Sequence, residues 1–376
     1  MHKPYDTYCL TRQATGKYRV LPDLPENVID FSSNDYLGFS RSGILLDAAI
    51  AAGQKYGVGA TGSRLFSGNL PVFSELEAQI ASDKITDAAL IFNSGFQANQ
   101  SVLASLLDAK VTGKRAVVFF DRLNHASLYQ GVFAAGAKME RYQHGCMNHL
   151  ESLLIKHNKY LAPKWIITET LFGMDGDIAP LADIIQLAAK YGAGIYLDEA
   201  HAMGMIGKSG YGLSTDFDLD DVPCIAMGTF SKALGGSGGY VACSQSIKNY
   251  LLNHAPGIIY TTAMSPMLVG AALSAWQKIA EMQADRKRLL GLSEKLRKYL
   301  QAAGFNTGLS ETHIIPVIMG DEKKALLARE KLLEKKILVS AVRPPTVPPK
   351  TSRLRMAVSL IHTEEDIIRL VEGLMS

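Results

Sequence analysis

One lysine, Lys232, stands between hydroxyl residues and a glycine run in the segment Gly228–Gly239. Upstream, the apolar run Ala193–Leu197 ends in Asp198, and His201 follows. A lysine amine can hold an aldehyde cofactor as an aldimine, and a carboxylate can keep a pyridine nitrogen protonated so that the ring withdraws electrons. The pairing of Lys232 with Asp198 therefore indicates pyridoxal phosphate chemistry, with His201 able to reach the same ring.

Other interpretations of these segments must be weighed. A lysine in a Gly/Ser loop is usually solvated, and an aspartate that ends a strand usually caps a turn. Gly207-Lys208-Ser209 resembles the end of a phosphate-binding P-loop, but Ala202 stands where that loop needs a glycine. Gly57–Gly62 matches the dinucleotide fingerprint, but Leu45–Lys55 before it has a helical pattern where a strand is required. The sequence therefore favours neither an NTPase nor a dinucleotide-dependent oxidoreductase.

The apolar pattern predicts the elements that position Lys232 and Asp198. Helical periodicity, as in Leu181–Tyr191, alternates with strand patterns, which predicts a mostly parallel sheet with right-handed crossovers. The carboxyl ends of such strands share one edge, where open α/β folds bind ligands. The expected strands are Ala88–Phe92, Ala116–Phe120, Trp165–Thr168, Gly194–Leu197 and Cys224–Met227.

A second, smaller unit is expected at the C-terminal end. One long amphipathic helix is predicted from Pro266 to about Ala303, with the domain boundary inside it. We predict an N-terminal segment 1–44, a large domain 45–275 and a small α/β domain 276–376. The small domain would contain His313–Met319, Lys323–Lys336 and Leu354–Ser359 and close with Thr363–Leu374.

A candidate phosphate site follows the strand pattern 88–92. Ser94, Gly95, Phe96 and Gln97 have the form of a capping box, and the free N–H groups at such a helix start attract an anion. A simple capping box without a ligand explains this segment equally well. Further donors would come from Thr229 and Ser231, and His125 would reach the same sheet edge after the strand that ends at Asp121.

Composition narrows the class of protein and its partners. The chain has 376 residues, 39 basic and 36 acidic, and its net charge of +3 suggests neither a nucleic-acid nor a membrane surface. No apolar run approaches the ~18 residues of a membrane span, and the first residues lack a secretory signal, so we expect a cytoplasmic enzyme with small-molecule partners. The four cysteines are too far apart for a zinc knuckle and are expected to be reduced. His144, His149 and Glu151 have poor metal-ligand spacing, and we expect no metal.

Together these segments resemble the α-oxoamine synthases, a family of fold-type I pyridoxal phosphate enzymes. Arg343–Pro348 with Arg353–Arg355 is similar to the biotin-pathway branch of that family. The resemblance implies an α/β fold of the aspartate aminotransferase type, with a large, mostly parallel sheet domain and a smaller C-terminal α/β domain. The motifs occur in matching order over nearly the whole chain, at Phe31–Gly38, Gly57–Arg64, Ser67–Asn69, Asn93–Asn99, Asn124–Ser127, Met174–Asp177, Asp198–His201 and Thr229–Lys232.

The resemblance also implies a reaction. It is the decarboxylative condensation of L-alanine with a pimeloyl thioester of coenzyme A or of a carrier protein, which gives 8-amino-7-oxononanoate, carbon dioxide and free thiol. A glycine C-acetyltransferase is the nearest alternative, and an aminotransferase would use the same lysine and aspartate.

The same resemblance implies a role for each site residue. Lys232 would bind the cofactor and remove the Cα proton, Asp198 would hold the pyridinium proton, and His201 would bond the phenolic oxygen. His125 would stack on the ring and contact the substrate. The phosphate would be held by Ser94, Gly95, Phe96, Thr229 and Ser231, the substrate carboxylate by Arg343, and the rest of the substrate site would contain Arg19, Asn34 and Thr346.

The resemblance also bears on one residue that differs from the family pattern and on the oligomeric state. Relatives commonly have serine where this chain has Gly173, so one hydrogen bond near the cofactor would be missing. In this family both subunits of a homodimer contribute to each site, and Thr261 and Thr262 lie where relatives send hydroxyls toward the neighbouring subunit's phosphate. We therefore expect a homodimer, with Asn34 near the interface.

Overall fold

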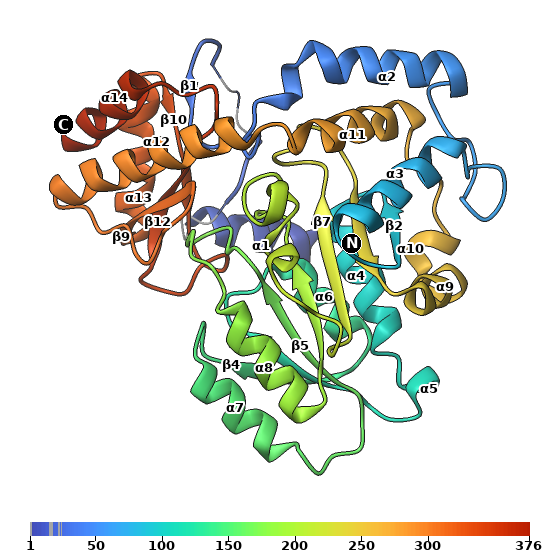
Figure 1. Cartoon of the computed structure of the whole chain (residues 1–376). Coiled ribbons are helices and arrows are strands. Elements are labelled where there is room, and N and C mark those ends of the chain that lie inside the picture. The colour runs from blue at the N-terminus through green and yellow to red at the C-terminus, as the bar shows by residue number, and fades with distance from the viewer. Residues whose placement is uncertain (1, 15–17, 22, 24) are drawn as a thin grey trace.

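The computed structural model describes residues 2–14, 18–21, 23 and 25–376. Its centre is a seven-stranded sheet in the order β2-β8-β7-β6-β5-β3-β4 (Figure 1). β8 runs antiparallel to both of its neighbours, and the other neighbouring pairs are parallel. The mostly parallel sheet is confirmed. Its strands are β2 Ala88–Phe92, β3 Val117–Asp121, β4 Lys138–Tyr142, β5 Lys164–Glu169, β6 Gly194–Asp198, β7 Cys224–Thr229 and β8 Gly239–Cys243.

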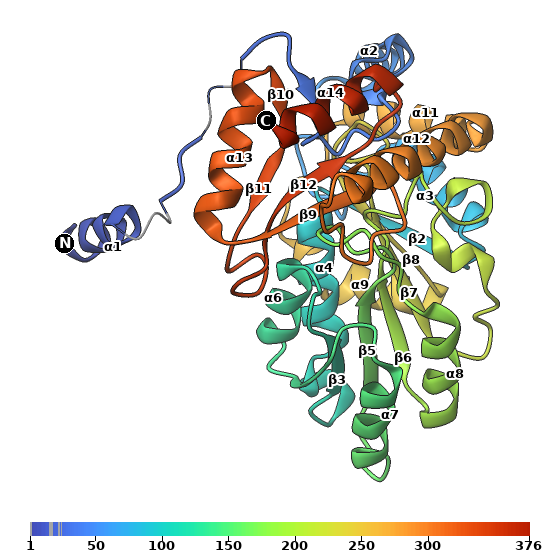
Figure 2. The same cartoon turned by 90° about the vertical axis from the view of Figure 1, so that its left-hand side faces the viewer.

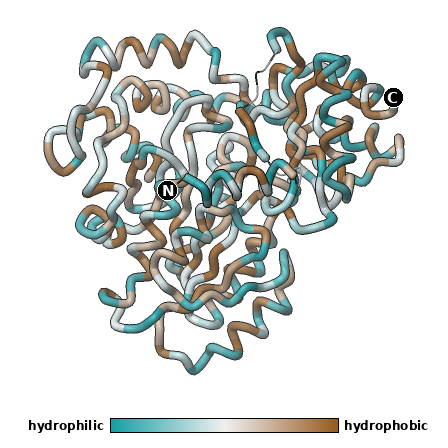
Figure 3. Tube along the Cα trace, turned by 180° about the vertical axis from the view of Figure 1, so that it is seen from behind, coloured by the Kyte–Doolittle hydropathy of each residue, from teal (hydrophilic) through white to brown (hydrophobic). Residues whose placement is uncertain are grey.

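Helices cover both faces of this sheet, so its inner strands are buried and apolar on both sides. On one face the core contains residues of α4 (Gly95–Leu106), α6 (Ala126–Ala134), α9 (Gln245–His254) and α10 (Pro256–Ile259). On the other face it contains residues of α7 (Met147–Lys156) and α8 (Leu181–Tyr191). In Figure 3 the hydrophobic colour follows the central strands, while the surrounding helices alternate between hydrophobic and hydrophilic residues.

All five predicted strands are present with small shifts at their ends, and two further strands were not predicted. β4 lies at the edge of the sheet and contains Lys138, Glu140 and Arg141, so it lacks a buried-strand pattern. β8 begins at Gly239, the last glycine of the run after Lys232, which conceals the start of the strand. Both strands are fixed by pairing with neighbours rather than by local composition.

The C-terminal unit contains a three-stranded sheet, β11-β12-β9, and a short parallel pair, β1 with β10 (Figure 2). α13 packs against β9–β12 and α14 packs against α12 and α13. β9, α13, β12 and α14 correspond to the four segments expected after residue 303, whereas the short strands β1, β10 and β11 were not predicted. Their bounds are β1 Ile29–Asp30, β9 Ile314–Gly320, β10 Ile337–Leu338, β11 Ser340–Val342, β12 Ser352–Ala357, α12 Gln283–Ala302, α13 Glu322–Glu334 and α14 Glu364–Met375.

The single long helix expected from Pro266 to about Ala303 is wrong. The chain instead forms α11 (Pro266–Ile279) and α12, separated by residues 280–282. No proline or glycine marks this break. The buried Arg286 places its Nη1 2.5 Å from the carbonyl oxygen of Ile279, where it caps the end of α11. The break therefore depends on a side-chain contact that the helical pattern does not reveal.

The other helices lie in the first 112 residues, apart from two short 3-10 helices after β6. α1 contains no buried residue and stands away from the rest of the chain (Figure 2). α2 packs along α11. Among the described residues, no helix is long and apolar enough to cross a membrane. The bounds are α1 Lys3–Ala14, α2 Gly43–Tyr56, α3 Pro71–Asp83 and α5 Ala109–Thr112, with short 3-10 helices at Phe39–Arg41, Lys208–Gly210 and Leu213–Asp216.

Candidate active site

The carboxyl ends of the central strands bring four candidate residues together. Asp198 is the last residue of β6, Lys232 follows β7, and His125 follows β3. His201 lies in the turn after β6. Two cavities meet here, and His125, His201 and Lys232 line both of them. Lys232 therefore lies at the junction of the two cavities.

Asp198 is held rigidly at the floor of the smaller cavity. Its Oδ2 accepts a hydrogen bond of 2.7 Å from Asn99 Nδ2, and its Oδ1 accepts one of 3.0 Å from the backbone N–H of Ala200. The Tyr196 hydroxyl donates to Asn99 Oδ1 at 2.8 Å, which fixes the orientation of the amide. Asn99, from α4, is a supporting residue to which the sequence interpretation gave no role.

Glu169 is a second buried carboxylate that sequence reasoning missed. It is the last residue of β5 and pairs with Asp198 of β6, so two acids lie side by side at the sheet edge. Burial, aided by the Asp198 charge, raises the pKa of Glu169 to about 8. Burial also lowers the pKa of Lys232 to about 8, although Asp198 and Glu169 oppose this. A lysine with such a pKa is readily deprotonated, as a nucleophile and general base must be.

His201 belongs to a hydrogen-bonded chain that reaches the small domain. Its Nδ1 lies 2.7 Å from the Tyr36 hydroxyl, which donates to Asn34 Oδ1 at 3.1 Å. Arg355 Nη2 donates to the same Asn34 oxygen at 3.0 Å. Burial, with the charges of Lys232 and Arg355, lowers the pKa of His201, so the ring is neutral and can hydrogen-bond a ligand.

Arg355 is the main site residue to which the sequence interpretation gave no role. It lies on β12, is 4% exposed, and donates from Nε to the Gly173 carbonyl at 2.5 Å. Its charge acts on both Lys232 and His201. An arginine within an apolar strand pattern is the signal that could have identified Arg355, because arginine is rarely buried unless it is paired with another group.

His125 caps α6, and its position is set by Ser127. Its Nδ1 lies 2.8 Å from Ser127 Oγ and accepts from the Ser127 N–H at 3.2 Å. Burial lowers the pKa of His125, so the ring is neutral. A neutral ring fixed at the cavity wall is suited to stack on a flat cofactor.

The N-terminus of α4 opens into the smaller cavity, which has a volume of about 260 Å³. Ser94 caps the helix by accepting from the Gln97 N–H at 3.1 Å. Gln97 Oε1 returns to the N–H of Asn93, at 2.9 Å, so the capping box is one residue longer than the sequence predicted. The N–H groups of Gly95 and Phe96 have no partner among the described residues. They form an anion site of the kind expected at a helix start.

Two hydroxyl pairs lie near this helix start. Thr229 Oγ1 donates to the Gly238 carbonyl at 2.7 Å and lies 2.8 Å from Ser231 Oγ, and both hydroxyl residues line the smaller cavity. Thr261 and Thr262 do not line it. Asn93 Nδ2 donates to the Thr261 hydroxyl at 3.2 Å and to the backbone carbonyl of Thr262 at 2.9 Å. A role for these threonines in the same subunit's cavity is therefore not supported.

Gly173 lies beside the site without lining either cavity. A Cβ at this position would lie 2.2 Å from His201 Nε2. A serine here would force the His201 ring to move, so the present position of His201 requires glycine at residue 173.

The larger cavity, about 690 Å³, extends from Lys232 to α13 and β11. It brings together the substrate-site residues predicted from the sequence, Arg19, Asn34, Arg343 and Thr346. Its lining residues are Tyr18, Arg19, Val20, Ser32, Asn34, His125, Met174, His201, Lys232, Leu326, Arg329, Ser340, Ala341, Val342, Arg343, Thr346 and Arg355.

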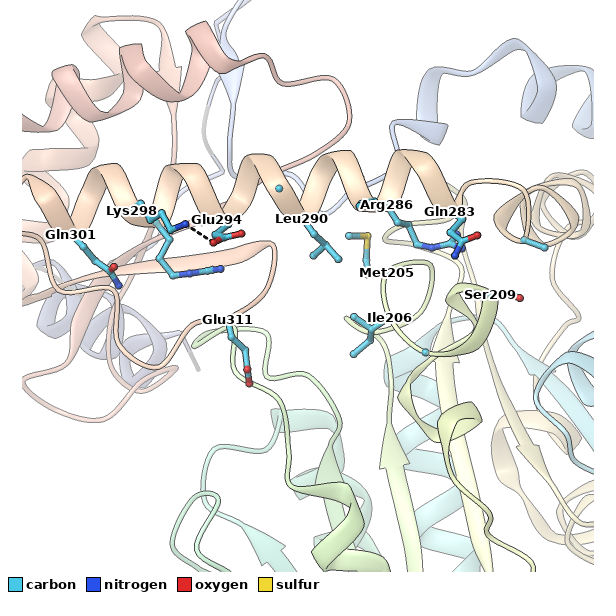
Figure 4. Close-up of a pocket in the computed structure, with 15 residues that line it drawn as sticks. Met205, Ile206, Ser209, Gln283, Arg286, Leu290, Glu294, Lys298, Gln301 and Glu311 are labelled. Carbon is cyan, nitrogen blue, oxygen red and sulfur yellow. Dashed lines mark ion pairs between the residues drawn. The ribbon is translucent and has the colours of Figure 1, made fainter.

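A separate hollow of about 990 Å³ lies under α12, beside the loop at residues 205–209 (Figure 4). Its charges are mixed, because Lys298 Nζ pairs with Glu294 Oε1 at 2.6 Å and Glu311 projects from the opposite wall (Figure 4). None of the site residues predicted from the sequence lines it.

Comparison with known proteins identifies the family. The model of the family described as aminotransferase class I and II matches residues 26–374. The chain is 44% identical over 350 residues to 8-amino-7-oxononanoate synthase of Gluconacetobacter diazotrophicus, which covers 93% of this chain and 87% of the relative. The chain belongs to the aminotransferase class I and II family, in its α-oxoamine synthase branch.

Solved structures agree with this membership. One described as SPT with its PLP internal aldimine superposes on this chain with a TM-score of 0.91, at 26% identity, and covers 100% of this chain and 97% of the other. That of 8-amino-7-oxononanoate synthase from Francisella tularensis gives a TM-score of 0.80 at 27% identity, over 93% and 98% of the two chains. The fold-type I architecture is confirmed. The protein is an enzyme that depends on pyridoxal 5'-phosphate.

The smaller cavity, at the start of α4, fits pyridoxal phosphate. Its two unpartnered N–H groups, at Gly95 and Phe96, can bind phosphate. Gly239 lies so close to the start of α4 that a Cβ there would be 2.8 Å from the Gly95 nitrogen, so a side chain would displace this helix start. Asp198 would hold the pyridine nitrogen and Lys232 the aldehyde carbon.

Proposed function

We propose that this protein condenses L-alanine with a pimeloyl thioester and releases carbon dioxide, free thiol and 8-amino-7-oxononanoate for biotin synthesis. The carrying observation is the position of Lys232, at the junction of a cavity that fits the cofactor and a larger one that can hold an acyl chain. The names of the relatives support the same reaction.

Each residue's part follows from its surroundings. Pyridoxal phosphate, when bound, supplies an electron sink for the carbanion at alanine Cα. Lys232, with its pKa lowered to about 8, removes the Cα proton as a general base. Asp198 keeps the pyridine nitrogen protonated, and His201 hydrogen-bonds the phenolic oxygen. Alanine Cα then bonds to the acyl carbon as the carbon–sulfur bond breaks and the thiol leaves. The former alanine carboxylate departs as carbon dioxide, and a proton takes its place on Cα.

Two arginines, Arg343 and Arg355, are candidates to bind the alanine carboxylate. Arg343 was assigned to it from the sequence, but Arg355 lies deeper and its charge acts on Lys232 directly. We propose that Arg355 binds the alanine carboxylate, because the carboxylate must lie within reach of the Cα proton that Lys232 removes. Arg343, with Thr346 and Arg19, then serves the acyl substrate.

We also propose that the active unit is a homodimer. Phe96 lines the cofactor cavity and is exposed. Val58, Phe66 and Tyr260 are further exposed apolar residues, and we call these four residues the rim patch. Ser265 Oγ donates to the Val58 carbonyl at 2.5 Å, so the loops that contain the rim patch are tied together. A partner subunit that covers the rim patch would bury these side chains and bring its own threonine hydroxyls to the phosphate.

Product analysis tests the function. Purified holoenzyme would be incubated with alanine or glycine and with pimeloyl or acetyl thioesters, and the products identified by mass spectrometry. We expect 8-amino-7-oxononanoate from alanine and the pimeloyl thioester. Preferred use of glycine with acetyl-CoA would make the chain a C-acetyltransferase, and pyruvate without thiol release would make it an aminotransferase.

A further inference from the structure

The larger cavity is lined by positive charge alone. Of the described residues that line it, five carry a cationic group and none is an aspartate or glutamate. The hollow under α12 shows the usual alternative, with charges of both signs (Figure 4). A concave site with one sign of charge attracts ligands of the opposite sign. The cationic residues are Arg19, Lys232, Arg329, Arg343 and Arg355.

Arg329 is a cation for which no role has been assigned. It lies on α13 and is half-buried. Leu326, one turn earlier, lines the same cavity, so one face of α13 forms part of the wall. Arg329 makes no hydrogen bond or ion pair with any described residue. A partly buried guanidinium without a protein partner is poised to bind an anionic ligand.

Between Arg355 and Arg343 the cavity wall is an extended strand whose middle residues, Ala341 and Val342, are apolar. Ser340 of β11 pairs with Arg355, and the wall continues through Ala341 and Val342 to Arg343. At about 3.3 Å per residue this wall is about 10 Å long, enough for several methylene groups in an extended chain. α13 packs against β11 and β12, which places Arg329 beside this wall.

We propose that Arg329 binds the distal carboxylate of the acyl substrate and selects ω-carboxyacyl thioesters over plain fatty acyl thioesters. This inference rests on the proposed function. The thioester carbon lies at Lys232, the methylene chain follows the apolar wall, and the terminal carboxylate meets the guanidinium of Arg329. A planar two-point contact with a carboxylate is the geometry that arginine provides and lysine does not.

Steady-state kinetics with a matched pair of substrates tests it. Holoenzyme would be assayed with pimeloyl-CoA and heptanoyl-CoA, which differ only in the terminal carboxylate. Wild type should prefer pimeloyl-CoA, and Arg329→Gln should lower kcat/KM for pimeloyl-CoA by about 10- to 100-fold while leaving heptanoyl-CoA and the KM for alanine unchanged. Arg369→Gln, an exposed arginine on α14 outside the cavity, is the matched control. Full selectivity in Arg329→Gln would overturn the assignment.

A binding measurement separates this inference from the proposed function. Calorimetry of pimelate and heptanoate with the holoenzyme needs no turnover. Pimelate should bind wild type more tightly than heptanoate, and Arg329→Gln should remove the difference. If the enzyme turns over neither thioester but Arg329 still discriminates the acids, the proposed reaction fails and the binding role stands. If wild type binds both acids equally, the role of Arg329 is wrong.

Discussion

Lys232 is the residue whose loss should abolish activity. Lys232→Ala should purify without the visible absorption of lysine-bound cofactor and show no turnover, because no other lysine among the described residues lines either cavity. Absorbance spectra and borohydride reduction followed by peptide mapping check this. Reduced cofactor attached to another lysine would contradict the assignment, and unchanged far-UV circular dichroism would serve as the folding control.

Substitutions of Arg355 and Arg343 should raise the KM of different substrates. Arg355→Lys should raise the KM for alanine by about 10-fold or more, since an ammonium cannot reproduce the planar grip of a guanidinium. Arg343→Lys should raise the KM for the thioester and leave alanine unchanged. The reverse pattern would restore the sequence-based assignment of the carboxylate to Arg343.

Single residues were predicted from the sequence where a motif marks them. Lys232, Asp198, His201 and His125 stand beside glycine runs or strand ends, and a pattern can show this. Glu169 also ends a strand, but no neighbouring motif marks it, and Arg355 stands inside the buried strand β12. The pairing of β5 with β6 and of β12 with β11 brings these two residues to the site.

At the scale of elements, a charged bridge joins two loops at the carboxyl edge of the sheet. The ring of His144 lies between Asp121, at 3.0 Å, and Asp177, at 2.7 Å, with the edge of Phe172 against it. Although burial opposes it, hydrogen bonds to the two carboxylates raise the pKa of His144 to about 10. The bridge ties the end of β3 to the loop that contains Gly173.

This bridge makes a stability prediction with a defined pH window. The pKa of His144 is higher in the folded than in the unfolded chain, so the stabilisation is complete below about pH 6.5 and is lost as the pH rises through about 10. His144→Gln should lower the free energy of unfolding by about 1–3 kcal/mol at pH 6 and by much less at pH 10.5. Urea titrations at both pH values measure this.

The matched control for the bridge is His149→Gln. The ring of His149 accepts a hydrogen bond from the backbone N–H of Gln143 at 3.1 Å and bonds neither Asp121 nor Asp177, so its replacement leaves the bridge intact. An equal deficit of His144→Gln at both pH values would show that the imidazolium charge does not matter.

Element prediction was most successful where apolar runs are continuous. β2, β3 and β6 are buried along their whole length, and the sequence shows them directly. The break between α11 and α12 was missed because Arg286 creates it through a contact with Ile279. Tertiary contacts of this kind override the local helical pattern.

At the scale of the whole molecule, the shared site of a homodimer has a direct consequence. Lys232→Ala and a second chain altered at Thr261 and Thr262 should each be inactive or strongly impaired. Refolded together, they should form hybrid dimers with one intact site. Recovery of about a quarter of wild-type activity is expected for random pairing, since half of the dimers are hybrids with half of their sites intact. Hybrids without activity, or an active monomer in sedimentation velocity, would contradict the shared site.

The reaction itself is tested most directly by the fate of the alanine carboxylate. Holoenzyme would be given L-alanine labelled with ¹³C at the carboxyl carbon, together with a pimeloyl thioester, and labelled carbon dioxide and free thiol would be measured in the same reaction. The proposed condensation predicts one labelled carbon dioxide for each thiol released, with no label in the aminoketone and no release from Lys232→Ala. Label retained in pyruvate, or thiol released without labelled carbon dioxide, would contradict it.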